Sequence, residues 1–192
     1  MRGRVSITVL AAAMAAAAGP ALSQTAPAVT WGPPIAGVCL FGREQAVTTS
    51  TAGASAIRQL QTLTQTSTAS LGPEQNAIKA EEQTLRGQAA TLAPATLQQR
   101  AAALNQRVQN FQQTVKAKNK QLGDAQAAAV GKIEAEINTI LPPLATSHRC
   151  SVVFERGTSY GSNPAMDLTP EVITQLNSRM PNVTVSLPAA AR

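Results

Sequence analysis

Residues 97–144 read LQQRAAALNQRVQNFQQTVKAKNKQLGDAQAAAVGKIEAEINTILPPL, and this stretch decides the fold. Its apolar residues recur at alternating spacings of four and three, which is the repeat of a coiled-coil helix. Two successive steps of four, from Lys118 to Leu122 to Gln126, form one stutter in that repeat. The stretch therefore predicts one long helix that packs along a single stripe. The other stripe residues are Leu97, Ala101, Leu104, Val108, Phe111, Val115, Ala129, Ile133, Ile137, Ile140 and Leu144.

A sparser stripe of the same kind precedes this helix. Pro94 separates the two stripes, and proline disfavours both a continued helix and a helical residue before it. The sequence therefore predicts two helices that fold back on each other as an antiparallel hairpin over residues 43–141. Gly72 and Pro73 favour a kink or a restart within the first helix. The first stripe comprises Ile57, Leu60, Thr64, Ser67, Leu71, Ile78, Leu85, Ala89 and Leu92.

Two short apolar segments flank the hairpin. Residues 35–41 predict a buried strand that ends at Gly42, and residues 150–154 predict a second strand. Residues 158–160 are a candidate third strand. An antiparallel hairpin with equal arms returns the chain to its starting point, so the first two strands can become neighbours.

A short helix is expected after the strands. Thr169 offers a hydroxyl that can cap it, Pro170 suits its first position and Glu171 its first turn. Pro181 ends it, and the alternating apolar residues of the following tail fit either an edge strand or disorder. The predicted fold is α+β and mostly α. Its parts are a signal peptide (1–23), a flexible leader (24–34), a β-rich body (35–42 and 142–180), a helical hairpin arm (43–141) and a C-terminal tail (181–192).

The first 23 residues have the pattern of a secretory signal peptide. Arg2 and Arg4 precede an uncharged apolar run over residues 5–18, and small residues follow at the cleavage site before Gln24. A membrane anchor is disfavoured because the run is too short for about 30 Å of hydrocarbon. A lipid anchor on Cys39 is disfavoured because that cysteine lies far downstream of the run. We therefore expect export to the periplasm.

Composition and charge limit the partners. Aromatic residues are 3% of the chain, which makes a large compact core hard to build. The net charge is +6, or +4 once Arg2 and Arg4 are removed, and this suits weak contact with an anionic membrane surface. Nucleic acid is not an expected partner because no basic run is interleaved with aromatic residues.

The residues needed for catalysis or metal binding are missing from the sequence. His148 is the one histidine, so a catalytic triad or a histidine zinc site has no partners. The acidic pairs Glu81–Glu82 and Glu134–Glu136 lie near basic residues on the predicted helices and are best explained as solvated surface pairs. No glycine-rich phosphate loop is present. We expect neither an enzyme nor a cofactor or metal site.

The order of these elements resembles the OmpH/Skp family of periplasmic chaperones. The matching segments are IAGVCLFG at residues 35–42, CSVVF at residues 150–154 and DLTPEVITQLN at residues 167–177, with the Gln/Ala-rich hairpin between the first two. The resemblance implies a jellyfish-like trimer whose body carries three tentacles around a cavity. It also implies a holdase that keeps unfolded outer-membrane β-barrel proteins from aggregating without ATP. The arm departs from the family in charge, because residues 43–141 hold ten basic and seven acidic residues, fewer basic ones than expected.

The alternative function is a structural coiled-coil spacer or adaptor of the cell envelope. An adaptor needs a β-rich half on each side of the hairpin, and too few residues precede the first strand to supply one. A plain spacer remains an open alternative.

The body and its cysteines carry the remaining predictions. A body this small buries little apolar surface alone, so self-association should cover its strands. The expected trimer core is Val38, Leu40, Val152, Val153 and Phe154. Cys39 and Cys150 are an even pair in an oxidising compartment, on strands expected to be neighbours, and are expected to form a disulfide. Two buried free thiols or an intermolecular bridge are the alternatives.

Overall fold

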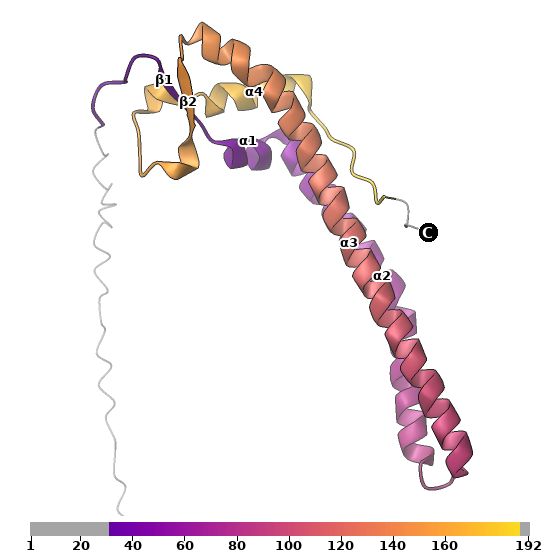
Figure 1. The fold of residues 1–192 in the computed structure, drawn as a ribbon. Coiled ribbons are helices and arrows are strands. Elements are labelled where there is room, and N and C mark those ends of the chain that lie inside the picture. The colour runs from indigo at the N-terminus through magenta and orange to yellow at the C-terminus, as the bar shows by residue number, and fades with distance from the viewer. Residues whose placement is uncertain (1–30, 189–192) are drawn as a thin grey trace, which may run out of the picture. The chain divides into compact units, whose positions relative to one another are not determined.

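The computed structural model describes residues 31–188 (Figure 1). The predicted signal peptide and most of the leader lie outside these residues. In chain order the main elements are β1 (Val38–Phe41), α1 (Arg43–Thr49), α2 (Thr51–Gln88), α3 (Pro94–Ser147), β2 (Val152–Glu155) and α4 (Thr169–Arg179). Across residues 31–188, no helix is both long and apolar enough to cross a membrane.

A break at Ser50 divides the first predicted helix into α1 and α2. Ser50 is fully buried, and its hydroxyl accepts a hydrogen bond from the N–H of Gly53 at 3.1 Å, which caps α2. Gly53 is needed here because a Cβ atom at this position would overlap the carbonyl oxygen of Val47. The apolar stripe did not predict this break, although a serine followed three residues later by a glycine marks it.

The long helices α2 and α3 lie side by side (Figure 1) and together form what we call the arm. Pro94 opens α3 at its first position, close to the predicted start. Pro73 lies inside α2, which continues without interruption, so of the two predicted alternatives, a kink or a restart, the restart is wrong.

The predicted end of the second helix near residue 141 is also wrong, because α3 runs to Ser147 through Pro142 and Pro143. Each proline removes one main-chain hydrogen bond of the helix. Both prolines are exposed, so the carbonyls left without partners can bind water. Ile140 and Leu144 are buried on the opposite side, 0% and 4% exposed, and hold the helix against the body.

The seam of α3 follows the predicted stripe with one shift. Gln126 is exposed, and Ala125 is 2% exposed in its place. The seam therefore advances by three residues from Leu122 to Ala125. Its successive steps of four residues then run from Ala125 through Ala129 and Ile133 to Ile137. A glutamine on the seam would bury an amide without a partner, whereas alanine fits a close helix contact.

The sheet consists of β1 and β2, which pair in parallel with Val38 opposite Val152 and Phe41 opposite Glu155. The candidate third strand over residues 158–160 is wrong, because Arg156–Thr158 form a 3-10 turn. Arg156 is drawn toward the start of α4 by an ion pair with Asp167 at 2.8 Å, and the chain turns instead of extending.

The core lies where the inner face of the sheet meets α1, α4 and the last third of α3. Its members share low exposure and apolar side chains. They include Cys39, Phe41, Ala46, Ile133, Ile137, Ile140, Leu144, Leu168, Val172 and Leu176.

Candidate functional site

One face of the sheet points away from this core. Residues alternate between the two faces of a strand, so Cys39 and Phe41 face inward and Val38 and Leu40 face outward. Val152 and Phe154, their partners on β2, are 44% and 54% exposed.

The predicted trimer core is therefore divided between the two faces. Val153 is paired with Cys39 and packs against the core. The other four residues share the outer face, where Leu40 is already covered to 5% exposure. We call these four residues, Val38, Leu40, Val152 and Phe154, the outer apolar face.

A disulfide joins Cys39 of β1 to Cys150, which lies just before β2. The two Cα atoms are 5.7 Å apart, although the residues are separated by 111 positions. Gly37 shapes the approach: its φ is +79°, and its carbonyl accepts hydrogen bonds from the N–H groups of Ser151 (2.7 Å) and Val152 (3.0 Å). The bond thus ties the two chain segments that enter and leave α1, α2 and α3.

The Asp167–Thr169 segment connects the start of α4 to the residue before α1. The Thr169 hydroxyl accepts a hydrogen bond from the N–H of Gly42 at 2.8 Å and donates to the Asp167 carboxylate. Asp167 also accepts from the Thr169 N–H at 2.9 Å and pairs with Arg156. Thr169 therefore does not cap α4 as the sequence predicts. Its hydroxyl instead binds the N–H of Gly42, the residue that follows β1, 127 positions earlier.

Two ion pairs join α2 to α3. Glu81 and Arg100 are 2.7 Å apart, and Glu74 and Arg107 are 2.6 Å apart. Glu81, which comes later in α2 than Glu74, pairs with Arg100, which comes earlier in α3 than Arg107. Hydrogen bonds from the Arg107 guanidinium hold the pKa of the Glu74 carboxyl below its usual value, and the pKa of Arg107 is raised in return. Both side chains are about half exposed, 42% and 44%, so the pair fixes register more than it adds stability.

The outer part of the arm is loosely packed. Between Leu71 and Leu122 the one buried residue is Leu85, whereas Leu104, Phe111 and Val115 of the seam are half-buried. Two helices cannot enclose each other, so one side of each seam residue stays near solvent. The outer arm therefore presents a mainly polar surface with apolar side chains partly accessible along it.

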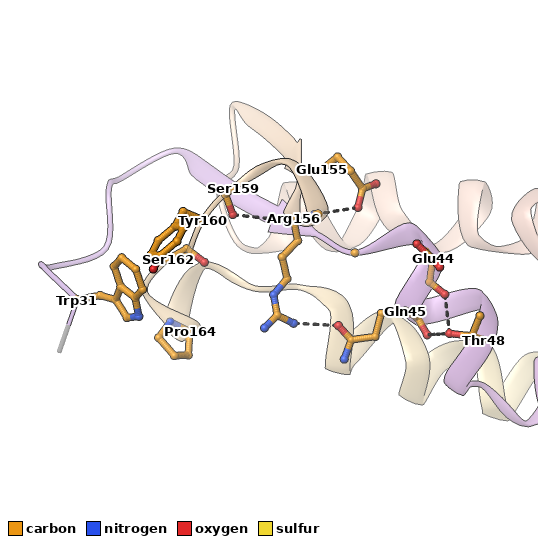
Figure 2. A pocket seen from close by; sticks show the side chains of 13 residues that line it. Trp31, Glu44, Gln45, Thr48, Glu155, Arg156, Ser159, Tyr160, Ser162 and Pro164 are labelled. Carbon is orange, nitrogen blue, oxygen red and sulfur yellow. Dashed lines mark hydrogen bonds between the residues drawn. The ribbon is translucent and has the colours of Figure 1, made fainter. Parts of the chain in front are cut away.

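A hollow with a volume of about 710 Å³ lies beside the sheet and α1 (Figure 2). Its lining is mostly polar. Arg156 donates a hydrogen bond there to the side-chain amide oxygen of Gln45 at 2.9 Å, and Trp31 and Tyr160 lie at the other end (Figure 2). Among the described residues that line this hollow, no nucleophile is hydrogen-bonded to a basic side chain.

The remaining polar candidates lie at the surface. His148 contacts Glu171 at 2.8 Å, and both side chains are exposed. Glu134 and Glu136 lie 3.9 Å from Arg43 and 3.6 Å from Arg179. Among residues 31–188, no three histidine, cysteine or acidic side chains are grouped so as to hold a metal ion.

A model of the family "Outer membrane protein (OmpH-like)" matches residues 38–176. The chain belongs to the OmpH-like family. The match begins at the first residue of β1 and ends within α4, so it covers the sheet, the disulfide, the arm and the Asp167–Thr169 segment. The OmpH-like family is not a family of enzymes.

A solved structure agrees with this assignment. The crystal structure described as an outer membrane chaperone (OmpH-like) from Caulobacter crescentus is 30% identical and superimposes with a TM-score of 0.73. The similarity covers 83% of this OmpH-like chain and 94% of the other. None of the curated protein sequences matches this chain significantly.

Proposed function

We propose that this OmpH-like protein is an ATP-independent holdase chaperone of the periplasm. It binds unfolded outer-membrane β-barrel proteins between its arms and prevents their aggregation. The observation that carries the proposal is the combination, in one OmpH-like chain, of a long polar arm with a loosely packed seam and a body on whose outer apolar face Val152 and Phe154 are about half exposed. Export depends on the predicted signal peptide at residues 1–23.

The outer apolar face supports assembly into a trimer. Val152 and Phe154 are about half exposed in the single chain, on a strand that lacks a second neighbour among residues 31–188. Large apolar side chains gathered on one face are typical of an association surface. Three copies that join through this face place three arms around a common cavity.

The arm suits weak and adaptable binding. As an antiparallel hairpin whose longer helix has 54 residues, it reaches about 80 Å at 1.5 Å per residue. Its surface is rich in Ala, Gln and Thr, so each contact with a client is weak and affinity comes from many contacts at once. The low excess of basic residues on the arm means that charge attraction contributes little. The same positive charge allows weak contact with an anionic membrane surface.

An aggregation assay tests the proposal. A urea-unfolded outer-membrane β-barrel protein is diluted into buffer, and light scattering is followed with and without the mature chain. A holdase suppresses scattering at about one assembly per client and needs no ATP. A spacer protein leaves scattering unchanged, and that result would overturn the proposal. A soluble helical protein of similar charge serves as the control.

A further inference from the structure

The C-terminal tail is extended and lies against the arm near the body. Three side chains of the arm hold it, and all of them bind its main chain. Gln59 of α2 donates to the carbonyl of Val183 at 2.7 Å and accepts from the N–H of Val185 at 3.0 Å. From α3, Lys132 donates to the carbonyl of Thr184 at 3.2 Å and Gln121 to that of Pro188 at 3.1 Å.

Gln59 binds the tail as a neighbouring strand would. In a parallel sheet, a residue accepts a hydrogen bond from one N–H of the neighbouring strand. The same residue donates its own N–H to the carbonyl that lies two residues before that N–H in the neighbouring strand. The Gln59 amide makes this pair of bonds on either side of Thr184. Ser55 fixes the amide orientation, because its hydroxyl accepts from the Gln59 nitrogen at 3.0 Å. The arrangement recognises backbone and is independent of side-chain identity.

The side chains of the tail follow a period of two. Val183 is 5% exposed and belongs to the core, and Val185 packs against that core. Thr184 and Ser186, between and after them, are exposed, and Leu187 is again half-buried. The contact therefore selects an extended segment with an apolar residue at every second position.

We propose that Gln59, Gln121 and Lys132 form a binding site for extended segments of this kind, and that the tail is its resident occupant. The proposal deepens the holdase function and rests on it for the nature of the partner. The strands of membrane β-barrels alternate apolar and polar residues. A client strand would displace the tail and make the same main-chain bonds, as peptides do when they add to a sheet edge.

A labelled peptide of residues 181–188 tests the site by fluorescence anisotropy. A chain that ends at Asn182 is expected to bind it about tenfold more tightly than the full mature chain, because a tethered tail competes at millimolar effective concentration. A control peptide has Val183 and Thr184 exchanged, which breaks the alternation, and it should bind weakly to both chains. Equal binding of the two peptides, or none by the folded shortened chain, would overturn the proposal.

A second variant covers the case in which the shortened chain fails to fold. Gln59→Glu in the full chain removes the donor to Val183 and places a negative charge at its carbonyl. Hydrogen exchange at the Val185 N–H should become at least about tenfold faster, since the tail detaches locally. Gln61→Glu, an exposed position on the same helix, is the control and should leave that exchange unchanged. Unchanged exchange in Gln59→Glu contradicts the proposal.

The aggregation assay separates this inference from the proposed function. Suppression of scattering without peptide binding by the shortened chain leaves the holdase function intact and removes the tail site. Peptide binding without suppression by either chain keeps the site for extended segments and removes the holdase function. Stronger suppression by the shortened chain than by the full chain supports both.

Discussion

Gly42 donates its N–H to the buried hydroxyl of Thr169 at 2.8 Å, across 127 positions of the sequence. Gly42 directly precedes α1, and Thr169 begins α4. Since Thr169 also donates to Asp167, its hydroxyl is both acceptor and donor. The start of α1 is thus held to the body by a side chain with 0% exposure.

Thr169→Val should therefore destabilise the body. Valine has nearly the same shape but leaves the Gly42 N–H buried without a partner, which costs about 1–3 kcal/mol. Urea unfolding at fixed protein concentration measures the loss. Thr169→Ser should keep most of the stability, and Thr174→Val, at an exposed hydroxyl on the same helix, is the control. Equal stability of Thr169→Val and the original chain would contradict this role.

The outer apolar face predicts different effects for two adjacent residues. Val152→Asp places a charge on the exposed face, so the chain should remain folded while the proposed trimer dissociates into monomers. Val153→Asp buries a charge against the core beside Cys39 and should unfold the body, because an unpaired buried charge costs several kcal/mol. Sedimentation equilibrium and circular dichroism distinguish the two outcomes. A folded trimer of Val152→Asp would exclude this face from the interface.

Local repeats in the sequence predicted the arm well. The spacing of Leu97, Ala101 and Leu104 locates the seam of α3, because every step of three or four residues returns to the same side of a helix. Pro142 and Pro143 misled the prediction, since a proline pair usually ends a helix. Here the buried neighbours Ile140 and Leu144 hold the helix together, and that tertiary support cannot be seen in the residues themselves.

The contacts of the body were harder to predict. The sequence identified the apolar strand residues. It did not reveal the parallel register that places Val152 on the outer face and Val153 against the core. Gln59 looks like any other polar helix residue in a Gln-rich arm. Its role depends on where the tail returns, 124 positions later, and no local pattern carries that information. The alternation of Val183, Val185 and Leu187 was visible, but its partner was not.

The Glu74–Arg107 pair predicts a specific titration. Because the pKa of Glu74 is lowered in the folded chain, the pair stabilises the arm above the unfolded carboxyl pKa, and this contribution is lost as pH falls through the folded value. NMR titration of the Glu74 carboxyl should give a pKa below its usual value. In Arg107→Gln the pKa should rise to near the usual value, while Arg58→Gln should have no effect. An unchanged pKa in Arg107→Gln would exclude the pair in solution.

The Cys39–Cys150 bond predicts the thiol count of the mature chain. The denatured, non-reduced chain should contain no reactive thiol and run as a monomer on a non-reducing gel. Replacing both cysteines by alanine should lower the free energy of unfolding by at most about 5 kcal/mol, since the bond closes a loop of over a hundred residues. Two reactive thiols would contradict the bond, and a dimer band would favour an intermolecular bridge.

The tip of the arm should open more readily than its base. Residues 89–93 connect α2 to α3, and around them the seam is only half-buried apart from Leu85. At the base, by contrast, Ala129, Ile133 and Ile137 are at most 2% exposed. Local opening needs less free energy where fewer apolar contacts are lost, so amide hydrogen exchange near Leu97 should be faster than near Ile133 by about tenfold or more. Leu85→Ala should speed exchange at the tip further and leave the base unchanged. Equal protection at tip and base would mean that the arm opens as one unit.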